Sequence, residues 1–223
     1  MTPPLPDAGS PALPPDAAEC LVLAGAPPRP GGEGASGRAW ALLSAVTSRR
    51  CAGVLIASDA AMSLDDYRRL RKRCVWVGLA QRVGRRTQSR TLARTVGDAL
   101  RLLRPSSVLA CDAALAGYAT PAPGRRVLVD MDGCASERRG RSWRRSGRPG
   151  PDAVAARHAD VVLVNHAALR GRVQAEAVAV VPTDDAGLIV AWLDGSPVRI
   201  ETPVRVPPAA VLTGAAGKVR RAA

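Results

Sequence analysis

Glycine, hydroxyl and guanidinium groups gather in one loop of this sequence, between an apolar run at 20–25 and a helical pattern that begins near residue 36. Gly31 and Gly32 let backbone N–H groups approach a phosphate or a sugar closely. Ser36 and Arg38 follow at the start of the helix, whose N-terminus carries partial positive charge. We predict that these residues bind a phosphate-bearing or sugar ligand, and a flexible turn in a glycine-rich protein is the alternative.

The glycines of this loop do not predict a dinucleotide site. Gly32, Gly34 and Gly37 match the spacing G-x-G-x-x-G. The loop is long and proline-rich, however, and no acidic residue closes the second apolar run until Asp59. We therefore predict no bound cofactor.

Carboxylates and a polar turn form the second candidate group. Asp130 ends an apolar run and Asp132 follows two residues later, with Ser136 and Glu137 in the turn beyond. At the carboxyl end of a strand these groups can hold a hydroxylated substrate or serve as a base. Asp112 ends another apolar run and is included among the predicted substrate-binding residues. For Asp132 alone, an Asp-Gly turn or a helix cap is the alternative.

No metal site is predicted, and the catalytic residues stay unassigned. Asp130 and Asp132 have no histidine partner nearby in the sequence, and we expect His158 and His166 to be structural or solvent-facing. No Ser-His-Asp or Cys-His arrangement follows from the spacing. The five cysteines are unevenly spaced and include no CxxC pair. Four of them adjoin apolar runs, and we expect these to be buried, reduced thiols in a cytosolic protein: Cys20, Cys51, Cys74 and Cys111.

Apolar runs and helical patterns alternate along the chain and must position these groups. We expect strands at residues 20–25, 51–57, 74–78, 107–111, 126–130, 160–164 and 177–181. Most are continuously apolar, which is typical of strands covered on both faces of a parallel sheet. Ser36 and Ser63 are predicted to cap the first two helices, and a third helix ends before Pro105. Shorter helices are expected after Asp112, near 151–152 and over 167–172.

This alternation predicts an α/β fold over residues 19–182, Rossmann-like and doubly wound, with a mainly parallel sheet and helices on both faces. Ligands of such sheets bind outside the carboxyl ends of the strands at the switch point, which we place between the first and fourth strands. The loops 26–36 and 111–118 should therefore form the site. Residues 1–18 are a proline- and alanine-rich leader that we expect to be disordered.

The net charge of +13 raises the question of a polyanionic partner. Aromatic content is 3% and the bases are dispersed apart from the stretch 138–148, which argues against nucleic acid as the partner. An anionic membrane surface or a phosphate-bearing substrate suits the charge better. The sequence shows neither a membrane-spanning run nor an export signal, so we predict a cytoplasmic protein, with peripheral attachment to the inner membrane face as an extension.

Several short motifs, taken in their order along the chain, resemble one known family. Residues 19–183 are similar to the N-terminal, acceptor-side domain of the family 4 GT-B glycosyltransferases, particularly bacterial enzymes of exopolysaccharide assembly. The motifs that carry the resemblance are Gly31-Gly32 with Arg38, Leu103-Arg104-Pro105, Ala116-Gly117-Tyr118-Ala119, Val129-Asp130-Met131-Asp132 with Ser136-Glu137-Arg138, the run 159–165, and Val180-Val181-Pro182-Thr183.

The resemblance implies a hexosyl transfer from a nucleotide sugar to a polysaccharide or lipid-linked acceptor. Residues 211–214 resemble the first strand of the family's second domain, which carries the nucleotide-sugar pocket and the paired-glutamate motif. We therefore expect 183–223 to be a linker and the truncated start of that domain. The chain alone is then expected to be inactive, to need a donor-domain partner, and to leave apolar surface uncovered near 181–193.

One departure from the family and one alternative belong with this expectation. The family's hinge usually reads Val-Pro-Asn-Gly, whereas this chain has Thr183 and Asp184 after Pro182. The alternative function is that of a non-catalytic Rossmann-like module, or a degenerate remnant, that binds an anionic ligand, because the fold alone implies no activity.

Overall fold

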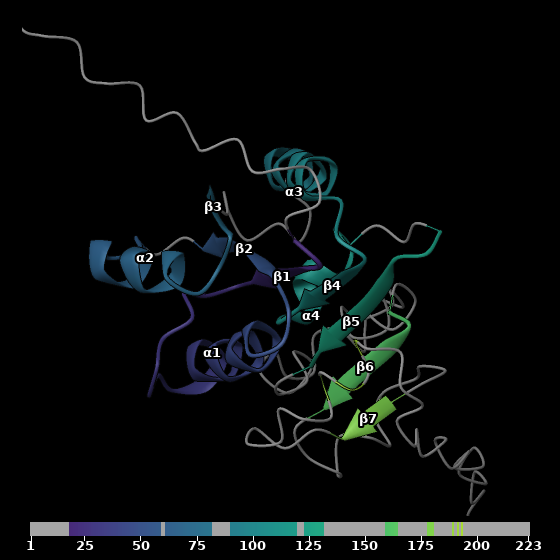
Figure 1. Ribbon diagram of the computed structural model, residues 1–223, viewed down its shortest axis with the longest axis horizontal. Helices are drawn as coiled ribbons and strands as arrows, with labels where there is room; N and C mark the ends of the chain where they lie inside the picture. The colour runs from purple at the N-terminus through teal and green to yellow at the C-terminus, as the bar shows by residue number, and fades with distance from the viewer. Residues whose placement is uncertain are drawn as a thin grey trace, which may run out of the picture.

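The structure is a computed structural model that describes residues 18–58, 61–81, 90–119, 123–131, 159–164 and 178–180, together with Ile189, Ala191 and Leu193. Within these residues, seven strands form one sheet in the order β3-β2-β1-β4-β5-β6-β7, and every neighbouring pair is parallel (Figure 1). Their bounds are β1 Cys20–Ala24, β2 Ala52–Ser58, β3 Trp76–Gln81, β4 Ser107–Ala110, β5 Arg126–Asp130, β6 Val161–Val164 and β7 Val178–Val180. The predicted doubly wound, Rossmann-like α/β fold is confirmed.

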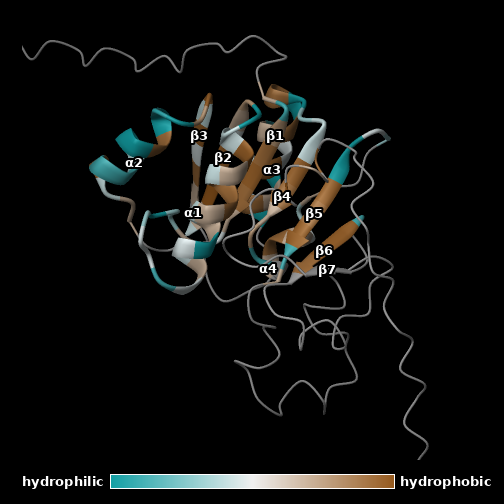
Figure 2. Cartoon of the chain, turned by 60° about the horizontal axis from the view of Figure 1, so that its bottom comes forward, coloured by the Kyte–Doolittle hydropathy of each residue, from teal (hydrophilic) through white to brown (hydrophobic). Residues whose placement is uncertain are grey.

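Helices cover both faces of this sheet, which Figure 2 shows as a largely hydrophobic layer. The helices are α1 Gly34–Thr47, α2 Leu64–Arg71, α3 Arg90–Leu103 and α4 Ala113–Ala116. Apolar side chains of α1 and α2 share one buried cluster with alternate strand residues, and those of α3 and α4 share the other. Figure 1 accordingly shows α1 and α3 on opposite sides of the strands.

The apolar stripes expected from the sequence are the surfaces that the helices bury. Four residues at helical spacing, Ala39, Leu42, Leu43 and Val46, are buried on α1. On α2 the Ser63 hydroxyl accepts a hydrogen bond from the Asp66 N–H at 3.1 Å, so the predicted cap is confirmed. The third helix ends at Leu103, where Arg104 takes a left-handed φ of 45° before Pro105.

Three local expectations were wrong. Ser36 is not the cap of the first helix, because α1 begins at Gly34 after Glu33 and the Ser36 hydroxyl bonds to the preceding loop instead. The third strand lies at Trp76–Gln81 rather than at 74–78, since the Cys74 N–H still donates to the Leu70 carbonyl oxygen in the turn after α2. Cys51 is exposed, because it precedes the buried part of β2.

The segment near residue 190 also corrects an expectation. Ile189, Ala191 and Leu193 are helical, and Ile189 and Leu193 are buried against the cluster that α1 and α2 cover. The Arg50 Nη2 donates to the Leu193 carbonyl oxygen at 3.2 Å. The apolar side chains at these two positions are therefore covered by the chain itself, not left open. The leader before residue 18, the shorter helices expected near 151–152 and 167–172, and the linker 183–188 and 194–223 lie outside the described residues.

Candidate functional site

The switch point of the sheet lies between β1 and β4, as the sequence predicted. β1 pairs with β2 on one side and with β4 on the other, so the chain leaves Ala24 and Ala110 at adjacent carboxyl ends and turns in opposite directions. The two loops that follow, from β1 to α1 and from β4 to α4, both start there. They carry three of the predicted site residues, Gly31, Gly32 and Asp112, while Ser36 and Arg38 lie in the first turns of α1.

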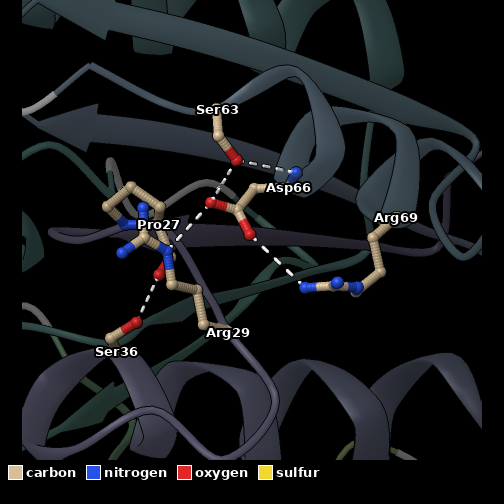
Figure 3. Close-up of polar contacts among 6 residues, drawn as sticks. All are labelled: Pro27, Arg29, Ser36, Ser63, Asp66 and Arg69. Carbon is tan, nitrogen blue, oxygen red and sulfur yellow. Dashed lines mark hydrogen bonds and ion pairs between the residues drawn. The ribbon is translucent and has the colours of Figure 1, made fainter.

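The β1–α1 loop is held by hydrogen bonds within itself. The Ser36 hydroxyl donates to the Pro27 carbonyl oxygen at 2.5 Å (Figure 3). The Gly32 N–H donates to the Arg29 carbonyl oxygen at 3.1 Å. Gly31 and Gly34 have left-handed φ angles of 66° and 56°, which glycine adopts without steric penalty. The glycines thus form a defined turn, and they also leave the surface of the loop open.

Close packing explains Gly37, in the first turn of α1. A Cβ added at Gly37 would overlap the carbonyl oxygen of Gly32, so the first turn of α1 lies directly against the loop backbone. A Cβ at Gly32 itself would lie 3.1 Å from the Ser36 Oγ. The G-x-G-x-x-G spacing in this chain therefore reflects a tight turn onto α1.

An ion pair joins this loop to α2. The Arg29 Nε donates to Asp66 Oδ2 at 2.9 Å, the Ser63 hydroxyl donates to the same oxygen at 2.8 Å, and the Arg69 Nη1 lies 3.4 Å from Asp66 Oδ1 (Figure 3). The Ser63 hydrogen bond, together with the charges of Arg29 and Arg69, lowers the pKa of Asp66 against the effect of burial, which would raise it. Sequence reasoning missed Arg29, although an arginine framed by prolines on both sides was the available signal.

Arg38 and Asp130, both predicted to bind substrate, are partners of each other. Arg38 Nη2 lies 2.9 Å from Asp130 Oδ1, and Nε lies 3.2 Å from Oδ2, so the guanidinium addresses both carboxylate oxygens. The two side chains are 3% and 0% exposed. This pair ties the first turns of α1 to the end of β5 within the protein interior. A ligand could reach either group only if the pair opened.

Asp112 lies at the switch point itself. Its carboxylate caps α4 by accepting a hydrogen bond from the Ala114 N–H at 2.9 Å, and the side chain is half-buried. A Cβ added at Gly25 would lie 2.8 Å from Asp112 Oδ2, so the absence of a side chain after β1 makes room for this carboxylate. Gly25 was not among the predicted site residues, and its place directly after the first strand was the only signal for it.

The buried thiols add no reactive group to this edge, where Cys111 follows β4, whereas Cys20 begins β1 and Cys74 precedes β3 at the amino edge. Burial raises the pKa of Cys111, and the neighbouring Asp130 charge raises it further. Burial likewise raises the pKa of Cys20 to about 11 and that of Cys74 to about 12. These three thiols are therefore neutral near physiological pH, which disfavours a role as nucleophile.

The remaining predicted groups lie outside the described residues: Asp132, Ser136, Glu137, the basic stretch 138–148, His158 and His166. Within the described ranges no three acidic, histidine or cysteine side chains are placed to hold a metal ion. In the same part of the chain, no helix combines the length and hydropathy that a membrane span requires.

Comparisons with known proteins add little. No protein-family model matches the chain, and no curated protein sequence matches it. One solved structure that resembles it is the crystal structure of Anabaena Alr3699/HepE in complex with UDP and glucose, with a TM-score of 0.47 and 15% sequence identity. The match covers 74% of this chain and 44% of that chain, so this chain spans less than half of the neighbour's length. A similarity of this size leaves the function to be argued from the chain's own residues.

Proposed function

We propose that this chain is an acceptor-side domain of the glycosyltransferase type, which holds a glycan or lipid-linked acceptor at the carboxyl edge of its sheet. The observation that carries the proposal is the close approach of the half-buried Asp112 carboxylate after β4 to Gly25, which begins the loop that carries the glycine turn, at the switch point of a parallel sheet. This is where sheets of this class bind ligands, and both groups suit a hydroxylated one.

The roles of the individual residues follow from their chemistry. A carboxylate such as Asp112 accepts hydrogen bonds from sugar hydroxyls, and backbone N–H groups of the turn at Gly31 and Gly32 can donate to a sugar or phosphate oxygen. Asp132, Ser136 and Glu137 follow β5, whose carboxyl end faces the same edge, and we assign them to the acceptor site as well. The pair Arg38 and Asp130 supports this edge from within.

Sugar transfer requires more than acceptor binding. The leaving nucleoside diphosphate must be held and its developing charge stabilised, and in the family that this chain resembles those groups belong mainly to the second domain. We therefore propose that this chain orients the acceptor hydroxyl for attack, and that a nucleotide-sugar-binding domain must complete the site. Incubated alone with UDP-glucose and an acceptor, the chain should release no UDP above background, and clear turnover would contradict this division of roles.

The acceptor site is tested with Asp112→Asn. Asparagine caps helices about as well as aspartate, so the variant should keep α4 while losing the carboxylate charge. We expect the affinity for acceptor glycans, measured by titration calorimetry over a panel of oligosaccharides, to fall roughly tenfold. Asp98→Asn is the matched control, because Asp98 is exposed on α3 and, among the described residues, pairs only with Arg101. Equal affinity in the wild-type chain and both variants would remove the proposed site.

A non-catalytic module is the second candidate, and the Arg38–Asp130 pair favours it. Both groups belong to the interior, so two of the predicted polar residues stabilise the fold at this edge and offer no charge to a substrate. The two candidates differ when a donor domain of the resembled family is added: the first predicts acceptor-dependent sugar transfer, and the second predicts none.

A further inference from the structure

The geometry points to Arg29 as a binding residue for an oxyanion, phosphate or carboxylate, on the ligand, with Asp66 as the residue that positions it. This inference deepens the proposed function, on which it rests for the identity of the acceptor as a sugar. It begins from how the loop presents the side chain. Pro27 and Pro28 are buried, whereas the Arg29 side chain is 48% exposed.

The backbone at Arg29 is fixed on both sides. Its carbonyl oxygen accepts from the Gly32 N–H at 3.1 Å, and its N–H lies 3.4 Å from the Ser36 carbonyl oxygen. The Ser36 hydroxyl in turn holds the Pro27 carbonyl oxygen, as Figure 3 shows. Pro28 and Pro30, on either side, have φ angles fixed by their rings, so the backbone around Arg29 has little freedom. The freedom that remains is that of the side chain.

Asp66 removes much of that freedom through one nitrogen. Only the Nε of Arg29 bonds to the carboxylate, because Oδ2 also takes the Ser63 hydroxyl and Oδ1 faces Arg69 (Figure 3). The two terminal nitrogens of Arg29 have no hydrogen-bond partner among the described residues. A pair built only to fasten the loop would gain more from two parallel N–H···O bonds. The observed contact orients the guanidinium and leaves its fork available.

A guanidinium fork fits the oxygens of a phosphate or a carboxylate. Both groups occur on sugars, as sugar phosphates and as uronic acids, and the shared chemistry is an oxyanion on the acceptor. The surroundings are open to such a group, since side chains added at Gly31 or Gly34 would meet no described atom within 4 Å. A preoriented cation binds more tightly than a mobile one because less side-chain entropy is lost on binding.

The test titrates the full-length chain with glucose, glucose 1-phosphate and glucuronate, and repeats the series with Arg29→Gln and Arg29→Lys. We expect the wild-type chain to bind at least one anionic sugar roughly tenfold more tightly than glucose, and Arg29→Gln to abolish that preference. Lysine keeps the charge without the fork, so Arg29→Lys should restore only part of it. The anionic sugar whose preference depends on Arg29 identifies the group as phosphate or carboxylate.

Arg69→Gln is the matched control, because Arg69 lies against the same carboxylate and is similarly exposed. The Arg69→Gln variant should keep the wild-type preference for anionic sugars. The positioning role predicts that Asp66→Asn weakens anionic-sugar binding in the wild-type background and adds nothing to Arg29→Gln. Tighter binding by Asp66→Asn would overturn that role.

The outcomes separate this inference from the proposed function. If no anionic sugar binds better than glucose, or if Arg29→Gln keeps the preference, Arg29 only fastens the loop and the inference fails. Sugar binding that then still depends on Asp112 leaves the proposed function standing. Conversely, an Arg29-dependent preference with no effect of Asp112→Asn retains the oxyanion site and removes the proposed acceptor site.

Discussion

Removing one partner of the Arg38–Asp130 pair should destabilise the protein far more than an ordinary charge substitution. In Asp130→Asn the Arg38 guanidinium stays buried without its carboxylate, whereas in the native protein Asp130 Oδ1 accepts from Nη2 at 2.9 Å. Breaking a buried ion pair in this way typically raises the free energy of the native state by about 3–5 kcal/mol. For a chain of this size, that corresponds to a decrease in Tm of roughly 6–20 °C.

The assay is equilibrium urea unfolding of the full chain, followed by circular dichroism, for a double-mutant cycle. We expect Arg38→Met combined with Asp130→Asn to be more stable than Asp130→Asn alone, because the double variant buries no uncompensated charge. The Asp98–Arg101 pair is the control: its side chains are 53% and 79% exposed, so Asp98→Asn should change stability by less than about 1 kcal/mol. A cost of similar size for Asp130→Asn and Asp98→Asn, or strict additivity in the cycle, would refute the reasoning.

Three further predictions concern glycine, acid stability and thiols. Gly37→Ala should lower the urea midpoint because its Cβ would overlap the Gly32 carbonyl oxygen. Gly97→Ala, in open space on α3, should stabilise the protein by about 0.5–1 kcal/mol. A Gly37→Ala variant that is more stable than Gly97→Ala would contradict the described turn. Asp66 has a lowered pKa in the folded protein, so its contribution to stability is present above the unfolded pKa of about 4 and is lost as the pH falls through the folded pKa. Asp66→Asn should therefore make the free energy of unfolding depend less on pH in the acid range. An unchanged pH dependence would count against the Arg29–Asp66 ion pair. Iodoacetamide at mildly alkaline pH, with sites mapped by mass spectrometry, should label Cys51 well before the buried thiols, and equal rates would contradict the burial of Cys20, Cys74 and Cys111.

The doubly wound parallel sheet could be predicted because its causes are local. Continuous apolar runs such as Leu21 to Ala24 indicate strands buried on both faces, and the helical patterns between them impose crossovers of one hand. Together these two features indicate a doubly wound sheet, for which we placed the switch point between the first and fourth strands, and the structure confirms that β1 lies beside β4. The ends of the strands were less predictable, because apolar residues such as Cys74 and Val75 precede β3 and extend its apolar pattern.

The pairing within the site could not be predicted in the same way. Arg38 and Asp130 are separated by 92 residues, and Arg29 and Asp66 by 37. A single sequence shows that each residue is charged but not which opposite charge the fold brings to it. Burial then reverses the interpretation of Asp130, since a carboxylate at a strand end indicates a substrate-binding group only while it remains accessible.

The distribution of charge shows why the overall excess of bases says little about the ligand. Many basic residues of the described chain lie at the ends of helices or in the loops that precede strands, at the amino edge of the sheet: Arg49, Arg50, Arg71, Lys72, Arg73, Arg101, Arg104, Arg125 and Arg126. Several of them bond to backbone carbonyls there, as Arg71 does to Val75 and Arg125 to Pro105. Such positions complement the negative ends of helix dipoles and need no ligand to explain them.

At the carboxyl edge of the sheet, the described residues include far fewer charged groups near the switch point. Around the switch point, Arg38 is neutralised by Asp130 within the interior, and Asp112 supplies a half-buried carboxylate. Arg29 is the cation of the β1–α1 loop that is both exposed and oriented by a neighbour. Binding of an anionic sugar at this edge should therefore change with Arg29 and remain insensitive to the basic residues at the amino edge, because screening in salt confines their influence to about 10 Å.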